Sequence, residues 1–307
     1  KGRRLRVIYE DDQSDPKIAV SVTQKLIQQD KVKAVVGFIG SSQLLASANL
    51  FNENKVILIS PGASSPEIRE AGEYIFRTRA SGRLEAISLA EYAIKKLNLQ
   101  KIAVLYVNND YGLSWLKEFS AKVEELGHKI IVREAYEQGS KDLRTQISKI
   151  KASNPDGLLI LGYLNEIAIA LRQVKELGLS VKILTTVGIQ DKKIFSLAPN
   201  CTEGVIYSTV DYDPANNPVS KKFDQAYFQK YSKSSDIFAA NAYDAVYLIA
   251  KAIQNVGYDG ERIKNYLLMI KDYPGAGGVL SFDEKGDVIK PVKLMKIIGD
   301  GFHEIIE

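Results

Sequence analysis

The sequence predicts an α/β protein with two lobes, each built around a parallel sheet. Strand-like runs rich in Val, Ile and Leu alternate with helical patterns along most of the 307 residues, which is typical of βαβ units. Several of these runs are continuously apolar, as expected for strands that helices cover on both faces. The length also suggests roughly two domains of ordinary size.

The predicted strands and helices follow one another in a regular order. The strand-like segments are residues 5–9, 34–39, 56–59, 102–107, 129–133, 157–162, 182–186 and 205–209. The helical segments are residues 16–30, 84–97, 113–126, 142–152, 166–177 and 239–253, and a further helix is expected to begin near Ser41 or Ser42.

Local signals support these assignments. In the first helix Ile18, Val22 and Leu26 recur at a spacing of four residues, which places them on one face. Pro16 lies in the first turn, where its missing N–H costs nothing. Gly127 and Gly178 follow two other helices, where glycine suits a left-handed C-terminal cap.

The chain also shows signs of passing between two lobes. Blocks of βα units cover residues 1–78 and 101–210, and polar segments at residues 77–83 and 211–217 are predicted to cross between the lobes. The tail differs, because residues 277–287 and 293–306 have the pattern of strands joined by turns.

The opening of the chain is unusual for a doubly wound lobe. Such a lobe normally begins with a central strand and its helix, whereas residues 4–10 have the pattern of an edge strand. This pattern predicts either that further residues precede Lys1 or that the lobe is truncated.

Composition favours a binding protein over several other classes. The formal charge of +4 is small and the basic residues are dispersed, whereas nucleic-acid binding requires a concentrated basic face. One cysteine excludes an internal disulfide and a cysteine-based zinc site. Two histidines leave little room for acid–base chemistry, and no GxGxxG, Walker, GxSxG or HExxH motif occurs.

The first candidate binding segment is residues 35–42. A buried strand ends, Gly37 and Gly40 allow a turn, and a helix starts near Ser41. The free N–H groups of a helix N-terminus suit an anion such as a carboxylate. The alternative is that Ser41 or Ser42 only caps the helix.

A second segment, residues 57–66, has the same form. A strand leads into the small residues Gly62, Ala63 and Ser64, which let a ligand approach the backbone closely. Two such strand ends predict a crevice at the carboxyl edge of a sheet. The alternative is a loop whose residues serve turn formation only.

Two tyrosines follow strands of the second block. Tyr111 and Tyr163 offer an apolar face and one hydroxyl each, which suits closure over a small ligand. The alternative is a surface or hinge position. Asp11, Asp12 and Asp15 form a carboxylate cluster before Pro16, and we interpret it as helix capping and not as a metal site.

Together these segments resemble one protein family. Residues 9–16 (YEDDQSDP), 37–42 (GFIGSS), 59–67 (ISPGASSPE), 110–112, 162–163, 203–205 and 282–287 match, in order and spacing, the periplasmic binding proteins of the leucine/isoleucine/valine-binding class. These are type I solute-binding proteins of ABC transporters. The resemblance extends over nearly the whole chain.

The resemblance implies a specific fold. It implies two Rossmann-like lobes joined by three crossovers, one made of residues 1–80 and 211–291 and the other of residues 81–210 and 292–307. The family's first strand and helix would lie before Lys1, so a tyrosine that some members supply from that segment has no counterpart here. Gly40 and Gln13 stand where the family has a cysteine pair.

The resemblance also implies a binding site. Ser41 and Ser64 would hold the ligand carboxylate, and the Gly62 carbonyl would face the ligand ammonium. Tyr111 and Tyr163 would close from the other lobe. The complete set of expected ligand-binding residues is Ile39, Gly40, Ser41, Gly62, Ala63, Ser64, Tyr111, Tyr163, Val187 and Phe238, with Phe238 lining the side-chain pocket.

The chain departs from the family at one position. Leucine-type members carry an acidic residue that pairs with the ligand ammonium, and Val187 stands there. Burying an ammonium without an acidic partner is costly. Either Asp191, Glu166 or Asp211 compensates, or the ligand lacks an amino group and is an aromatic or aliphatic carboxylate.

The expected function is therefore solute capture without catalysis. The resemblance implies a receptor that delivers a hydrophobic or branched-chain amino acid to an ABC permease by hinge closure. It further implies a monomer without metal, cofactor or nucleic acid, in the periplasm or lipid-anchored at the outer surface. The alternatives are a receptor for a carboxylate without an amine, and a sensory domain, which flanking transmembrane or DNA-binding segments would distinguish.

Overall fold

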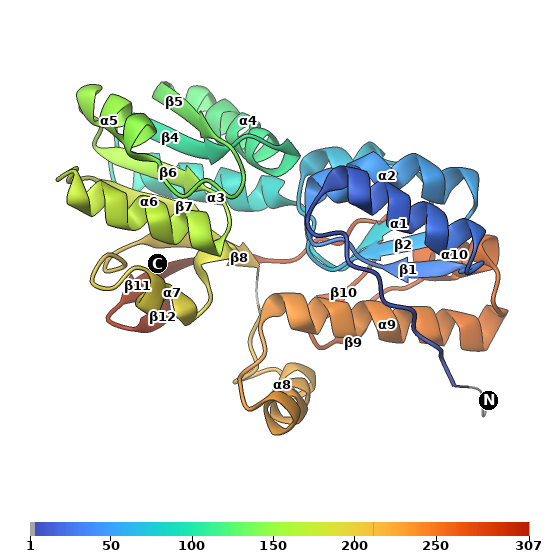
Figure 1. Cartoon of the computed structure of the whole chain (residues 1–307). Coiled ribbons are helices and arrows are strands. Elements are labelled where there is room, and N and C mark those ends of the chain that lie inside the picture. The colour runs from blue at the N-terminus through green and yellow to red at the C-terminus, as the bar shows by residue number, and fades with distance from the viewer. Residues whose placement is uncertain (1–3, 211, 307) are drawn as a thin grey trace. The chain divides into compact units, whose positions relative to one another are not determined.

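The computed structural model describes residues 4–210 and 212–306, and the chain divides into two compact units. The first unit comprises Lys1–Ser81 and Asp211–Pro291, and the second comprises Gly82–Val210 and Val292–Glu307. The chain thus crosses between units after residues 81, 210 and 291 (Figure 1). Each unit is a sheet flanked by helices, as the sequence predicts.

The first unit contains a small parallel sheet. Its strands are β1 (Ala34–Val36), β2 (Ile57–Ser60) and β3 (Ile75–Arg77), in the order β1-β2-β3. The register places Val36 opposite Ile59, and Ile59 opposite Phe76. Every residue of β2 and β3 is buried, because helices cover both faces of the sheet.

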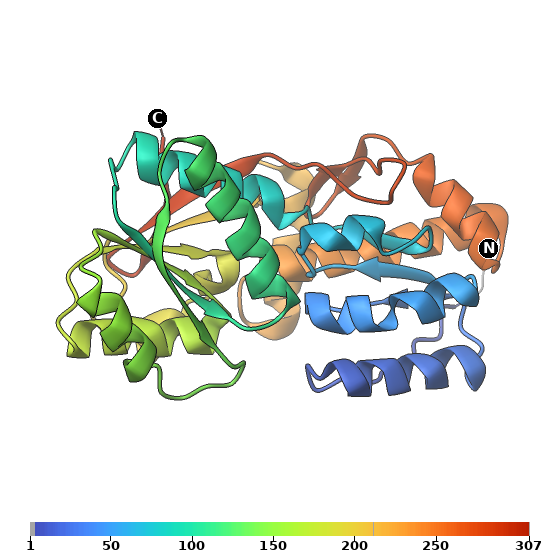
Figure 2. The ribbon, with the colours of Figure 1, turned by 90° about the horizontal axis from the view of Figure 1, so that it is seen from above.

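Helix α2 (Ser41–Glu53) covers one face of this sheet, and α1 (Pro16–Gln28) lies beside α2 (Figures 1 and 2). Leu44 and Phe51 of α2 pack with Leu58 of β2 and Ile75 of β3 in one buried cluster. On the other face lie α9 (Ile237–Val256) and α10 (Gly260–Leu268).

The rest of the first unit consists of short elements and one further helix. These are η1 (Pro66–Glu70), α8 (Pro218–Tyr231) and the antiparallel pair β9 (Tyr273–Gly275) and β10 (Gly278–Leu280). Phe282 and Val288 form an isolated bridge around the turn at residues 283–286.

The second unit contains the larger sheet, with the strand order β12-β11-β8-β7-β6-β4-β5. Its strands β8, β7, β6, β4 and β5 are parallel, and β11 is antiparallel to β8 and β12. Their bounds are β4 Ile102–Val107, β5 Ile130–Tyr136, β6 Gly157–Leu161, β7 Lys182–Thr186, β8 Ile206–Val210, β11 Val292–Ile298 and β12 Gly301–Glu304.

Successive residues of its central strands enter two different cores. Leu158 and Ile160 pack against one layer, formed by α5 (Arg144–Ala152) and α6 (Leu164–Glu176). Leu159 and Leu161 pack against the opposite layer, formed by α3 (Gly82–Lys95) and α4 (Asp110–Glu125), where Trp115 is fully buried. The short η2 (Val187–Ile189) and α7 (Lys193–Leu197) follow β7. This two-layer packing explains the continuous apolar run of β6.

One predicted strand is wrong. Residues 5–9 form no strand, and their apolar side chains are exposed, with Leu5 at 51%, Val7 at 56% and Tyr9 at 87%. A strand requires a neighbour for its backbone N–H and C=O groups, and no described strand pairs with this segment. The strand-like composition of these residues alone was therefore insufficient.

Other expectations were incomplete. The predicted strand at residues 34–39 ends at Val36, the strand–turn–strand pattern at residues 277–287 is reduced to β10 and an isolated bridge, and β3, α7, α8 and α10 were not predicted. The segment at residues 77–83 does lead to a crossing, but its first residue, Arg77, is buried in β3. The caps at Gly127 and Gly178 are confirmed, with φ of 83° and 62°.

Candidate functional site

The turns after β1 and β2 lie against each other in the first unit. Ser41 is the first residue of α2 and is buried, and its Oγ accepts a hydrogen bond of 3.1 Å from the Ser65 N–H. The interpretation of Ser41 or Ser42 as the helix cap is wrong, because Gly40 occupies that position. The hydroxyl of Ser41 instead joins the two turns.

Gly40 leaves the N-terminus of α2 without a side-chain cap. The first N–H groups of a helix have no partner within the helix itself, and Gly40, as the N-cap residue, has no side chain to accept from them. Ser42 makes further interactions of its own. A Cβ on Gly40 would lie only 1.9 Å from Gln43 Oε1, so a larger residue does not fit here without moving that side chain.

Ser60, which the sequence analysis did not select, organises the second turn. It ends β2, its Oγ donates to the Phe38 carbonyl at 2.6 Å, and the same Oγ accepts from the Ala63 N–H at 3.0 Å. The sequence signal that could have identified Ser60 is a hydroxyl at the last residue of a buried apolar strand. Ser60 thus connects the second turn to the first.

Gly62 allows the two turns to approach closely. A Cβ at this position would lie 3.0 Å from Ile39 Cα and 2.9 Å from Ile39 Cδ1. Ala63 is buried, whereas the Ile39 side chain is largely exposed. Ile39, Gly40, Gly62 and Ala63 are therefore brought together, although Ile39 presents its side chain to solvent.

Ser64 differs from the other serines of this region. Its side chain is 5% exposed, and its hydroxyl has no hydrogen-bond partner among residues 4–210 and 212–306. A ligand can therefore hydrogen-bond this hydroxyl without displacing a partner from the protein.

Phe238 lies in the first turn of α9, in the same unit. It is half-buried, and Asp236 caps the helix by accepting from the Ala239 N–H. One turn further along α9, Asn241 Nδ2 donates to the Pro61 carbonyl at 3.3 Å. The N-terminal part of α9 therefore reaches the second turn.

The second unit brings two tyrosines together at the carboxyl ends of adjacent strands. Tyr111 lies at the start of α4 after β4, and Tyr163 caps α6 after β6. Their rings stack with centroids 5.5 Å apart and an interplanar angle of 28°. Tyr111 Oη donates to Thr186 Oγ1 at 2.8 Å, and Asn109 Nδ2 donates to Tyr163 Oη at 3.2 Å.

These contacts fix the orientation of the two rings. Burial raises the pKa of Tyr163, so its phenol is neutral at physiological pH. Val187 follows β7, the strand next to β6, and is buried beside Thr186. Tyr111, Tyr163 and Val187 therefore share one edge of the sheet of the second unit.

The acids considered as partners for an ammonium lie in different surroundings. Glu166 is buried, and its Oε1 accepts from the Gly139 N–H at 2.9 Å. Asp191 is exposed and accepts from the Lys193 N–H at 2.8 Å. Asp211 lies outside the described residues.

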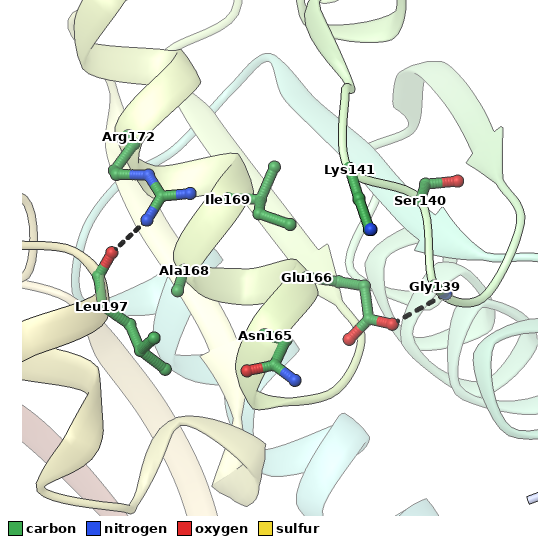
Figure 3. A pocket seen from close by; sticks show the side chains of 9 residues that line it. All are labelled: Gly139, Ser140, Lys141, Asn165, Glu166, Ala168, Ile169, Arg172 and Leu197. Carbon is green, nitrogen blue, oxygen red and sulfur yellow. Dashed lines mark hydrogen bonds between the residues drawn. The ribbon is translucent and has the colours of Figure 1, made fainter.

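Glu166 lines a separate cavity of about 300 Å³ within the second unit (Figure 3). There, Arg172 donates to the Leu197 carbonyl. The cavity is lined by Gly139, Ser140, Lys141, Asn165, Glu166, Ala168, Ile169, Arg172 and Leu197. No residue of the expected ligand-binding set is among them.

Among residues 4–210 and 212–306, no cluster of three or more His, Cys, Asp or Glu side chains could hold a metal ion. Asp15 caps α1 by accepting from the N–H groups of Lys17 and Ile18, as expected.

None of the helices in residues 4–210 and 212–306 combines the length and apolar character needed to cross a bilayer.

Comparison with known proteins places this architecture in a family. The leucine-, isoleucine-, valine-, threonine- and alanine-binding protein of Pseudomonas aeruginosa is 32% identical over 289 residues, which cover 94% of this chain and 77% of that protein. The Leu/Ile/Val-binding protein of Escherichia coli is 26% identical over 292 residues, with coverage of 94% and 78%.

Solved structures agree. A leucine-binding protein from Thermotoga maritima superposes with a TM-score of 0.93 at 29% identity, covering 99% of this chain and 88% of the other. A branched-chain amino acid transporter substrate-binding protein from Streptococcus pneumoniae, in complex with isoleucine, gives 0.89 at 26% identity with the same coverage. A family model described as periplasmic binding protein matches residues 1–301, and the chain therefore belongs to the periplasmic binding protein family.

Proposed function

We propose that this chain is the receptor of an ABC importer and captures an aliphatic amino acid such as leucine. The first unit binds the ligand carboxylate at the turns after β1 and β2. The observation that carries this proposal is that the N-terminus of α2, where Gly40 offers no side-chain cap, is joined by the Ser41 hydroxyl to the turn that carries Ser64. The helix N–H groups and the Ser64 hydroxyl donate hydrogen bonds, and a carboxylate accepts them.

Tyr111 and Tyr163 contribute contacts when the protein closes on the ligand. Their stacked rings form an apolar surface that suits an aliphatic side chain. A ligand shifts a conformational equilibrium only through contacts that differ between the two states. The two tyrosines supply that difference in this proposal, and Phe238 adds to the side-chain pocket.

The family supports the following biological setting as part of the proposal. The protein works outside the cytoplasmic membrane, in a periplasm or anchored by a lipid, and delivers its ligand to a membrane permease. It acts as a monomer and catalyses no reaction. The amino acid ligand itself is proposed because relatives of 32% and 26% identity carry amino acid-binding names.

Val187 favours a second candidate ligand class. It is a buried apolar residue at the end of β7, so it offers no charge to an ammonium. A carboxylate without an amine, such as an aromatic or aliphatic acid, avoids the cost of burying that ammonium. The carboxylate turns would serve both classes equally.

Isothermal titration calorimetry with leucine, isoleucine, valine and benzoate tests the proposal. We expect binding of at least one of the three amino acids and none of benzoate. Binding of benzoate alone would replace the amino acid by a carboxylate without an amine. The absence of binding by all four would contradict the proposed function.

A further inference from the structure

Buried polar groups hold the second turn of the first unit, residues 61–65, at both ends. At one end the Ser65 carbonyl accepts a hydrogen bond of 2.7 Å from Arg77 Nη1. At the other end the Pro61 carbonyl accepts from Asn241 Nδ2 at 3.3 Å. Ser64, the proposed carboxylate ligand, lies between these two anchors.

The two side chains that anchor the turn, Arg77 and Asn241, are each held by a charged residue. Arg77 donates from Nε and Nη2 to the two carboxylate oxygens of Asp287, at 2.5 and 2.6 Å. This bidentate geometry fixes the plane of the guanidinium. Lys290 Nζ donates to Asn241 Oδ1 at 2.9 Å and to the Gly277 carbonyl at 2.8 Å, which orients the amide so that its N–H faces Pro61.

These groups are buried at a cost. The Arg77 side chain is fully buried and Lys290 is 2% exposed. Burial lowers the pKa of Lys290 to about 8, while nearby Asp244 raises it and Arg79 lowers it further. A buried cation is unfavourable unless its hydrogen bonds are complete. Arg77 bonds the turn directly at the Ser65 carbonyl, whereas Lys290 bonds Asn241 and the Gly277 carbonyl.

The anchoring residues also lie close to the chain crossings. Arg77 precedes the crossing after Ser81, and Asp287 and Lys290 precede the crossing after Pro291. Thr78 Oγ1 also donates to the Asn241 carbonyl at 3.0 Å. The second turn is therefore connected by hydrogen bonds to two of the segments through which the chain leaves the first unit.

We propose that Arg77–Asp287 and Asn241–Lys290 are positioning residues that hold the second turn in the geometry required for ligand binding. This inference rests on the proposed function, since it assigns the support of the same carboxylate site. The two pairs act through the turn, and the affinity for leucine depends on them.

The sharpest variant is Asn241→Asp. It keeps the Oδ1 acceptor for Lys290, replaces the N–H group that reaches Pro61 by an oxygen, and adds a negative charge, which the control variant also adds. Asn52→Asp is the matched control in the same unit, because Asn52 Nδ2 donates to the Ala71 carbonyl at 2.8 Å while its Oδ1 accepts from the Tyr74 N–H. Asn52 lies near the C-terminal end of α2, whereas Ser41 is the first residue of that helix.

Calorimetry and amide hydrogen exchange are measured on both variants. We expect Asn241→Asp to raise the Kd for leucine at least tenfold and Asn52→Asp to change it less than twofold. In the free protein, the amides of Ala63 and Ser65 exchange faster in Asn241→Asp. The Leu143 amide, which donates to Gln173 Oε1 in the second unit, is unchanged.

Unaltered exchange at Ala63 and Ser65, or a Kd within twofold of wild type, overturns the inference. Should Asn241→Asp not fold, Arg77→Lys makes the same test at the Ser65 anchor, because lysine pairs with Asp287 but cannot donate to both partners in the same way. Exchange in the free protein needs no ligand. Failure of the proposed function would instead appear as wild-type protein that binds none of the tested solutes.

Discussion

The two units present different chemistry at the carboxyl ends of their strands. In the first unit, small residues and hydroxyls form the turns after β1 and β2, and Ser41, Ser60 and Ser65 link those turns. In the second unit, two stacked tyrosines follow β4 and β6. Backbone and hydroxyl donors suit a common head group, whereas aromatic faces suit a variable side chain.

The units also differ in how their candidate residues are supported. Buried charged side chains support the second turn of the first unit, Arg77 directly and Lys290 through Asn241. The tyrosines of the second unit are held by neutral hydrogen bonds to Thr186 and Asn109. Changes in the first unit are therefore expected to have larger effects, and four experiments test that ranking.

The largest effect is expected from Arg77→Met. It leaves the buried Asp287 carboxylate without its bidentate partner, although Arg69 Nη1 remains at 3.6 Å from Asp287 Oδ2. We expect a loss of about 3 kcal/mol in unfolding free energy by urea denaturation, the lower end of what breaking a buried pair costs. Arg83→Met, at an exposed pair with Glu118, is the control. Equal stability of the two variants would contradict the ranking.

The second largest effect is expected from Ser64→Ala, which removes the hydroxyl proposed to bind the carboxylate. The affinity for leucine should fall more than tenfold, or about 1.4 kcal/mol, in a calorimetric titration. Ser21→Ala, on the exposed face of α1, serves as the control. An affinity unchanged by Ser64→Ala would argue against carboxylate binding at this turn.

The third experiment follows stability against pH. Because the pKa of Lys290 is lowered to about 8 in the folded protein, the unfolded chain holds more protons between pH 8 and the ordinary lysine pKa of 10.5. Stability must therefore rise with pH in this window. We expect the slope between pH 8 and 9.5 to be steeper than in Lys290→Met by about 1 kcal/mol per pH unit.

Denaturation curves at several pH values give both slopes. Asp244 and Arg79, the charged groups that face Lys290, are present in both proteins, so their contributions largely cancel. Equal slopes for wild type and Lys290→Met would show that burial does not lower the pKa of Lys290.

The smallest effect is expected from Tyr163→Ala. It removes the stack with Tyr111, a contact worth about 0.5–1.5 kcal/mol, and leaves the first unit intact. Small-angle scattering with saturating leucine should show a smaller ligand-induced compaction than wild type, while Tyr106→Ala serves as a control on the same strand as the Tyr111 turn. Full compaction in Tyr163→Ala would show that Tyr163 does not contribute to closure on the ligand.

The sequence predicted the second unit better than the first for a physical reason. Strands such as β4 and β7 are found where predicted, at residues 102–107 and 182–186, because their apolar runs reflect burial on both faces. The segment at residues 5–9 has a strand-like pattern, yet whether it pairs depends on a neighbouring strand that local sequence does not specify.

The candidate site shows the same limit. The small residues at the two turns marked their location, but not that Ser41 would bind the Ser65 N–H. From the sequence, Arg77 was interpreted as part of a polar crossing, and nothing in the local pattern marked Lys290. Their partners are distant in sequence, as Asp287 is from Arg77, so pairing and burial emerge only in the folded chain.

Trp115 has a practical consequence for separating the two units. It is the only tryptophan in the sequence, and it is buried between α4 and the large sheet. Its fluorescence emission therefore reports the melting of the second unit alone, whereas circular dichroism sums over both. A variant such as Arg77→Met can thus shift the dichroism transition while the indole signal keeps its wild-type midpoint, which would locate the damage without any added label.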